Sequence, residues 1–112
     1  MAYDVELANR LRAALAGEQH VSEKAMFGGL AFLIDGAMAV AVSGQGGLLL
    51  RVDPNETDAL LRRRGVHRFV MHGRELAGWL RIEDAAMRTD AQLAGWVRRG
   101  VAQARLAPAR RR

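Results

Sequence analysis

Apolar side chains recur at helical spacing near the start of the chain. Leu7, Leu11 and Leu15 fall on one face of a helix, with Asp4 placed as its N-cap and Gly17 as its stop signal. The pattern therefore predicts an amphipathic helix that packs against the rest of the domain through this face.

The end of the chain shows the same helical spacing. Thr89 and Gln92 have the spacing of a capping box, which marks the start of a helix. The apolar stripe that follows consists of Leu93, Trp96, Val97, Val101 and Ala104. We expect Trp96 to anchor this second helix on the core.

Between the two helices the pattern alternates every second residue, as in strands. The segments 29–34 and 37–42 are predicted strands, and Asp35-Gly36 predicts a tight hairpin turn between them. Alternation in the second segment places its larger side chains on one face and its alanines on the other. The larger set is Met38, Val40 and Val42, and the alanine face is Ala37, Ala39 and Ala41. A face of small residues permits close approach, and we favour helix cover or a dimer contact over a ligand.

A third predicted strand, "LLLRVD", leads into "DPNE", which has the spacing of a helix start. Asp53 is the expected N-cap, Pro54 the first helical residue and Glu56 the partner in a capping box. The helix is expected to run to Gly65, with Arg62–Arg64 in its last turn, where cations complement the helix dipole. The alternative is a patch that contacts phosphate, which would need further basic residues on the same face.

Two more alternating segments, "HRFVMH" and "GWLRIE", complete the pattern. The predicted order is α-β-β-β-α-β-β-α, an α+β fold with a mostly antiparallel sheet of about five strands and three helices. An extra short strand at "SEKAMF" is left open. We expect one domain over residues 1–106, followed by a disordered basic tail at residues 107–112.

Composition narrows the function classes. The 112-residue chain has no cysteine, which excludes disulfides and cysteine chemistry. Its formal net charge is +5, but the terminal Arg110–Arg112 supply three of these charges, so the body of the domain is hardly a nucleic-acid surface. No secretory leader and no membrane span is evident, and we expect a cytoplasmic protein with no membrane contact.

The polar residues form no catalytic or metal-binding constellation. Ser22 and Ser43 have no histidine beside them in the pattern, and His20 has no second ligand at metal spacing. His67 and His72 are five residues apart, which puts them on opposite faces of a strand. We therefore expect no enzyme, no metal and no cofactor.

The glycine pair Gly28-Gly29 lies inside an apolar run. A loop that cradles phosphate leads into a helix, whereas this pair leads into a strand. Glycines in a strand pattern mark a bend, a bulge or a close approach of backbones, so we expect the chain to turn here. The neighbouring Phe27 is expected to be a core residue.

The same region carries a resemblance. The stretch "KAMFGGLAFLIDGAMAVAV", followed by "LLLRVD" and later by "LAGWV", resembles the N-terminal domain of the TfoX/Sxy family of bacterial competence regulators. The likeness extends from about Leu7 to Ala104 and is most specific between Lys24 and Gly29.

This resemblance implies a two-layer fold like that of secretion-chaperone domains, commonly paired as dimers. The best-known members regulate genes for DNA uptake together with a cyclic-AMP-responsive transcription factor. They also carry a C-terminal helix-rich domain, and the present chain is expected to be a single-domain member without it.

The resulting hypothesis is a non-enzymatic regulatory domain, a homodimer that contacts a protein partner such as a transcription factor. The candidate contact residues are Lys24, Met26, Gly28, Gly29 and Arg51. The alternative is weak nucleic-acid binding by a transcription co-regulator through its last helix and the tail. Its candidate residues are Arg98, Arg99 and Arg105. A small enzyme of unknown reaction is the second alternative.

Overall fold

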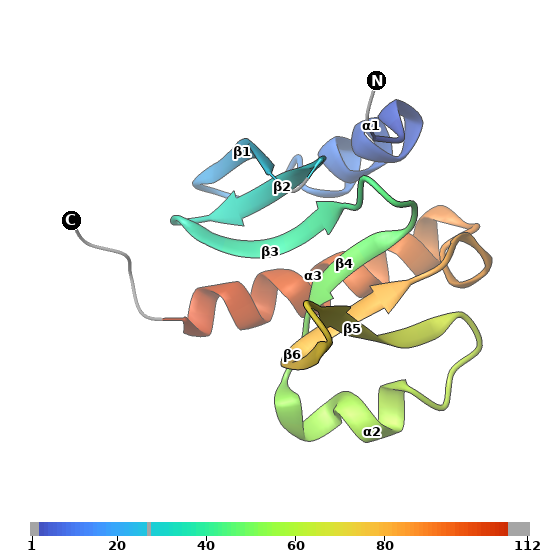
Figure 1. Cartoon of the computed structure of the whole chain (residues 1–112). Coiled ribbons are helices and arrows are strands. Elements are labelled where there is room, and N and C mark those ends of the chain that lie inside the picture. The colour runs from blue at the N-terminus through green and yellow to red at the C-terminus, as the bar shows by residue number, and fades with distance from the viewer. Residues whose placement is uncertain (1–2, 27, 108–112) are drawn as a thin grey trace.

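The structure is a computed structural model that describes residues 3–26 and 28–107. It is an α+β fold in which one antiparallel sheet carries α1 and α3 on the same side (Figure 1). The helices are α1 (Val5–Ala14), α2 (Thr57–Leu60) and α3 (Asp90–Leu106), with short 3-10 turns η1 (Pro54–Glu56) and η2 (Asp84–Ala86). The predicted fold class is confirmed, whereas Phe27 and residues 108–112 of the predicted tail lie outside the described residues.

The sheet has six strands in the order β1-β2-β3-β4-β6-β5. The strands are β1 (Val21–Met26), β2 (Gly29–Ile34), β3 (Ala37–Val42), β4 (Leu48–Arg51), β5 (Val66–Met71) and β6 (Arg74–Ile82). The sixth strand is β1, which the sequence left open. It pairs along its whole length with β2, from Val21 opposite Ile34 to Met26 opposite Gly29.

The helix caps predicted at Asp4 and Thr89 are confirmed. The Asp4 side chain accepts a hydrogen bond from the amide of Leu7 at 3.1 Å. Thr89 and Gln92 form the reciprocal capping box, with both hydrogen bonds at 3.0 Å. Local side-chain chemistry thus sets where α1 and α3 begin.

Asp53 is the N-cap and Pro54 the first residue of the segment, as predicted, but the predicted capping box with Glu56 is wrong. The Asp53 carboxylate accepts from the amide of Asn55 at 2.9 Å, and the Glu56 carboxylate accepts from Arg99 of α3 at 2.8 Å. The segment opens as a 3-10 turn, and α2 ends at Leu60, short of the predicted end at Gly65. Arg62–Arg64 lie beyond the end of the helix and not in its last turn.

The core lies between the sheet and the pair α1 and α3. Phe32, Leu50 and Leu80 are fully buried there, together with Leu11 of α1. The predicted stripe of α3 is buried throughout, and the Trp96 ring nitrogen donates to the carbonyl of Ala86 at 2.9 Å. Trp96 is therefore the anchor that its sequence context predicts.

A β-bulge changes the expected faces of β3. Phe32 lies opposite Val40 and Leu33 lies opposite Met38, which leaves Ala39 without a partner in β2. One extra residue reverses the alternation of side chains. Ala37 and Ala39 consequently join the core with Val40 and Val42, whereas Met38 and Ala41 lie on the opposite face. The predicted three-alanine face does not exist.

Gly100 lets α3 approach this bulge closely. A Cβ on Gly100 would stand 2.6 Å from the carbonyl oxygen of Ala39 and 3.0 Å from a methyl group of Leu50. Gly95, one and a half turns earlier in the same helix, has only the end of the Arg98 side chain near its Cβ position, at 3.9 Å.

We expect Gly100→Ala to lower the free energy of unfolding by about 1–2 kcal/mol, because overpacking against a fixed carbonyl outweighs the gain in helix propensity. The matched change Gly95→Ala should raise the same free energy by up to about 1 kcal/mol, since it gains propensity without a clash. Urea unfolding followed by circular dichroism measures both. Equal effects of the two substitutions would contradict the close contact.

An ion pair ties α1 to the edge strand β1. The Arg12 guanidinium donates to both carboxylate oxygens of Glu23, at 2.7 and 2.8 Å. These hydrogen bonds lower the pKa of Glu23 below its ordinary value. The pair therefore stabilises the folded state at neutral pH, and this contribution is lost as the pH falls through the lowered pKa.

We expect Glu23→Gln to reduce thermal stability slightly at neutral pH and to have no effect once Glu23 is protonated in acid. The pair is exposed, so the effect should also shrink with added salt. Thermal scans across the acid range test this. A pH-independent difference would contradict it, as would an unchanged effect of the substitution in an Arg12→Ala background.

Candidate protein-interaction face

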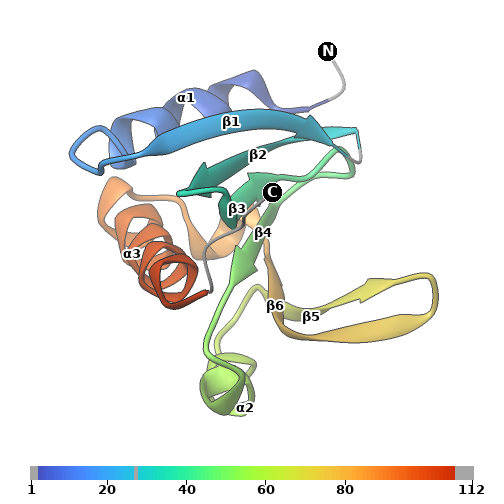
Figure 2. The same ribbon diagram turned by 90° about the vertical axis from the view of Figure 1, so that its left-hand side faces the viewer.

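The face of the sheet turned away from α1 and α3 carries a second, smaller apolar cluster. We call this face the outer face. Its centre is Ala31, Ala41 and Leu49, which are buried beneath the partly exposed side chains of Met26, Leu33, Met38 and Phe69. Figure 2 shows that the β5–β6 hairpin bends away from the other strands. Within this bend, Gly78 has a positive φ of 82°, and its carbonyl accepts from the amide of Val52 at 2.8 Å.

The structure places Lys24 and Met26 on the outer face. Lys24 lies opposite Ala31, a member of the cluster, and Met26 follows two residues later on the same side of β1. Lys24 is exposed, whereas Met26 is half-buried against the cluster. Both predicted contact residues are thus accessible from one direction.

Gly28 and Gly29 have a structural role in the hairpin between β1 and β2. Gly28 has a φ of 76°, a conformation that favours glycine. A Cβ on Gly29 would overlap the carbonyl oxygen of Val42 and would stand 3.1 Å from the amide nitrogen of Gly44. The chain therefore turns here, as predicted, and these two residues shape the loop without presenting side chains.

Arg51, the remaining candidate, is built into the outer face. Its Nε donates to the carbonyl of Met38 at 2.7 Å, and its guanidinium lies over the Trp79 ring, 4.7 Å from the centroid. Arg51 and Trp79 are direct partners across β4 and β6. Stacking and a hydrogen bond therefore hold this arginine in one orientation.

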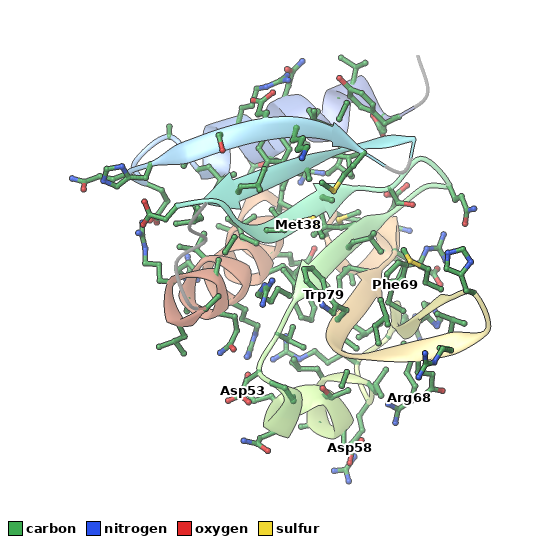
Figure 3. All side chains as sticks on the ribbon, turned by 60° about the vertical axis from the view of Figure 1, so that its left-hand side comes forward. Met38, Asp53, Asp58, Arg68, Phe69 and Trp79 are labelled. Atoms are coloured by element: carbon green, nitrogen blue, oxygen red, sulfur yellow. The ribbon has the colours of Figure 1, made fainter. Side chains whose placement is uncertain are left out.

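A groove of about 280 Å³ crosses the outer face next to these residues. Met26, Met38, Phe69 and Met71 contribute its apolar lining. Figure 3 shows Met38, Trp79 and Phe69 along the inner side of the bend between β3 and the β5–β6 hairpin. Methionine side chains adapt their shape to a bound apolar group, which suits a groove that receives a protein segment.

The charges on this face are of one sign over its centre. Lys24 lies opposite Ala31 and Arg81 lies opposite Leu49, both in the apolar cluster, while Arg51 lies opposite Trp79. Arg81 also donates to the carbonyl of Gly46 at 3.2 Å. Glu83, at the end of β6, contacts His67 of β5. The outer face therefore presents an apolar centre with basic groups around it.

The three predicted nucleic-acid residues differ in their surroundings. Arg105 pairs with Glu18 at 2.7 Å, near the start of β1. Arg98 and Arg99 instead line a cleft together with Arg63 and Arg64 from the segment after α2. The sequence did not reveal this grouping, because Arg64 and Arg98 are 34 positions apart in the chain.

Trp79 and Phe69 were not predicted as site residues from the sequence. A signal was available for Trp79, whose alternation with Leu80 and Ile82 places a large aromatic residue on the face opposite the core. No local pattern identifies Phe69, because the bend of the hairpin brings it to the cluster.

Within residues 3–26 and 28–107, no three histidine, aspartate or glutamate side chains are grouped so that they could hold a metal ion. In the same part of the chain, no helix has the length and apolar character required to cross a membrane.

The sequence model of the TfoX N-terminal domain family matches residues 13–104. Comparison with curated proteins and with solved structures found no match, and the likeness to secretion chaperones stays a prediction. The matched range includes β1 to β6 and all but the last two residues of α3. The chain belongs to the TfoX N-terminal domain family.

Proposed function

We propose that this domain binds a protein partner through its outer face and acts as a regulatory adaptor in the cytoplasm, without catalysing a reaction. The observation that carries the proposal is Arg51, fixed over Trp79 and bonded to Met38 beside a methionine-lined groove. Tryptophan, arginine and methionine are enriched at the centres of protein interfaces.

The layering of the fold supports the choice of this face. The helices α1 and α3 cover the other face of the sheet, so that side is used for the core. The outer face carries only a small apolar cluster, and several apolar side chains packed against this cluster remain partly exposed. A partner that covers them would remove apolar surface from water.

The charges indicate the chemistry of the partner. Lys24, Arg51 and Arg81 favour a segment that presents apolar side chains flanked by carboxylates. Family members are best known for acting with a transcription factor, and a transcription factor with such a segment is the partner we propose.

We expect the double variant Lys24→Ala, Arg51→Ala to weaken partner binding by about thirtyfold or more, the effect of losing an interface hot spot. The partner is first isolated with the wild-type domain and identified, and its affinity is then measured with purified proteins by calorimetry. Val5→Ala is a control for truncation of a side chain away from the outer face, because Val5 is an exposed apolar residue at the start of α1.

Unchanged affinity of the double variant, with its fold intact by circular dichroism, would sink the proposed role of this face. Sedimentation velocity of the domain alone shows whether a second copy of the chain or a different protein occupies this face. If the wild type is a dimer that the double variant dissociates, a second copy and not a different protein occupies the face. The predicted homodimer is tested by the same measurement.

A further inference from the structure

A larger hollow lies on the solvent side of α3, away from the outer face. It is a cleft of about 840 Å³, within the range of roughly 300–1,000 Å³ that is usual for small-molecule sites. Residues of α3 form one wall of the cleft. The segment that contains α2 lies below α3 and forms the opposite wall (Figure 1, Figure 2). The charged lining consists of Arg63, Arg64, Arg98 and Arg99 with Asp53 and Glu56, a formal charge of +2 from four cations and two anions.

Two of the four arginines are held in place. Arg99 donates to Glu56 at 2.8 Å, which joins α3 to η1 across the cleft. The Arg63 guanidinium lies over the Trp96 ring, 5.2 Å from its centroid. Trp96 is itself buried and bonded to the carbonyl of Ala86. These two cations therefore form a rigid basic wall.

The other two arginines are exposed and uncompensated. Among the residues that the structure describes, no carboxylate lies within ion-pair distance of Arg64 or Arg98. Asp53, the second acid of the lining, accepts from the amide of Asn55 at 2.9 Å. Arg64 and Arg98 thus line one cleft, and neither side chain has a hydrogen-bond acceptor among the described residues.

We propose that this cleft binds phosphate groups, with Arg64 and Arg98 as the contacting residues and Arg63 and Arg99 as fixed cations behind them. The triple arginine after α2 alone would be a solvated basic turn. Joined with Arg98 and Arg99 of α3, it becomes a concave basic surface on two elements that an ion pair holds together.

Two arginines lining one cleft suit a ligand that carries linked phosphates. A guanidinium group presents a planar fork of donors that fits two phosphate oxygens at once. Neighbouring phosphates supply enough acceptors and charge for both Arg64 and Arg98, whereas a single carboxylate satisfies one fork. Linked phosphates occur in free diphosphate ligands, and consecutive phosphates occur along a nucleic-acid strand, so the shared chemistry has two sources.

The test uses the whole domain and two probes at about 150 mM salt, where long-range attraction between exposed charges is screened. Sodium pyrophosphate is titrated by calorimetry, and a fluorescein-labelled duplex DNA is titrated by anisotropy. The cleft variant is Arg64→Gln, Arg98→Gln. The control variant Arg62→Gln, Arg74→Gln removes the same charge from exposed arginines outside the cleft lining.

We expect the cleft variant to lose about tenfold or more in affinity for one probe, while the control variant stays within about twofold of wild type. Loss confined to pyrophosphate identifies a free phosphate ligand, and loss of duplex binding identifies a nucleic-acid backbone. The variant Arg64→Lys, Arg98→Lys keeps the charge but removes the planar fork of donors. Its affinity should lie between that of the cleft variant and that of the wild type. No binding of either probe, or an equal loss in both glutamine variants, overturns the proposal.

Discussion

Gly29→Ala is expected to lower the free energy of unfolding by about 3 kcal/mol or more, the upper end of overpacking effects. A Cβ at this position would overlap the carbonyl oxygen of Val42, which is backbone and belongs to the neighbouring strand β3. The strand cannot yield without losing the pairing of Leu30 with Val42. The expected result is a large shift of the urea midpoint with little change in its slope.

The neighbouring Gly28 supplies the matched control. It has open space around its Cβ position and a φ of 76°, so Gly28→Ala carries conformational strain alone. We expect that change to cost about 1 kcal/mol, and Gly28→Asn to cost less because asparagine tolerates this conformation. If Gly29→Ala were as mild as Gly28→Ala, the close approach of β2 to β3 would be wrong.

These two glycines show what the family motif requires. In the segment that most resembles the TfoX N-terminal domain, one glycine provides a turn and the next provides room for a carbonyl of another strand. The sequence alone argued against a phosphate loop, since the pair leads into a strand. It could not distinguish the two roles, because the Val42 contact depends on a pairing distant in the chain.

Elements with strong local signals were predicted correctly. The caps at Asp4 and Thr89 and the turn at Asp35-Gly36, with φ values of 51° and 83°, depend on side chains within a few residues. The capping box predicted at Asp53 is absent because the Glu56 carboxylate bonds to Arg99 of α3, a contact from outside the segment. Tertiary competition for one carboxylate outweighed a local motif.

The candidate site likewise contains residues that were predictable from the sequence and one that was not. Lys24, Met26 and Arg51 came from the family resemblance, and strand alternation places them on one face. The faces of β3 were mispredicted because a single bulged residue, Ala39, leaves no mark in the hydrophobic pattern. Met38 therefore joined the site as a consequence of tertiary structure.

Phe32 and Phe69 offer a direct comparison of the two apolar clusters. Phe32 is 1% exposed in the main core, whereas Phe69 is a partly exposed member of the outer cluster. We expect Phe32→Ala to lower the free energy of unfolding by about 3–5 kcal/mol, the range for a buried aromatic residue, through lost burial and a cavity. Phe69→Ala should cost less than half as much.

Binding should show the opposite order. Phe69 lines the groove, whereas Phe32 lies beneath the other face of the sheet. Phe69→Ala should therefore lower the affinity for the partner, while a folded Phe32→Ala domain should bind the partner normally. Denaturant unfolding gives the stability of each variant, and binding is measured at a temperature where both remain folded. Equal losses of stability would contradict the division into a main core and an outer cluster. Normal binding by Phe69→Ala would instead remove the groove from the interaction face and leave Arg51 and Trp79 as its centre.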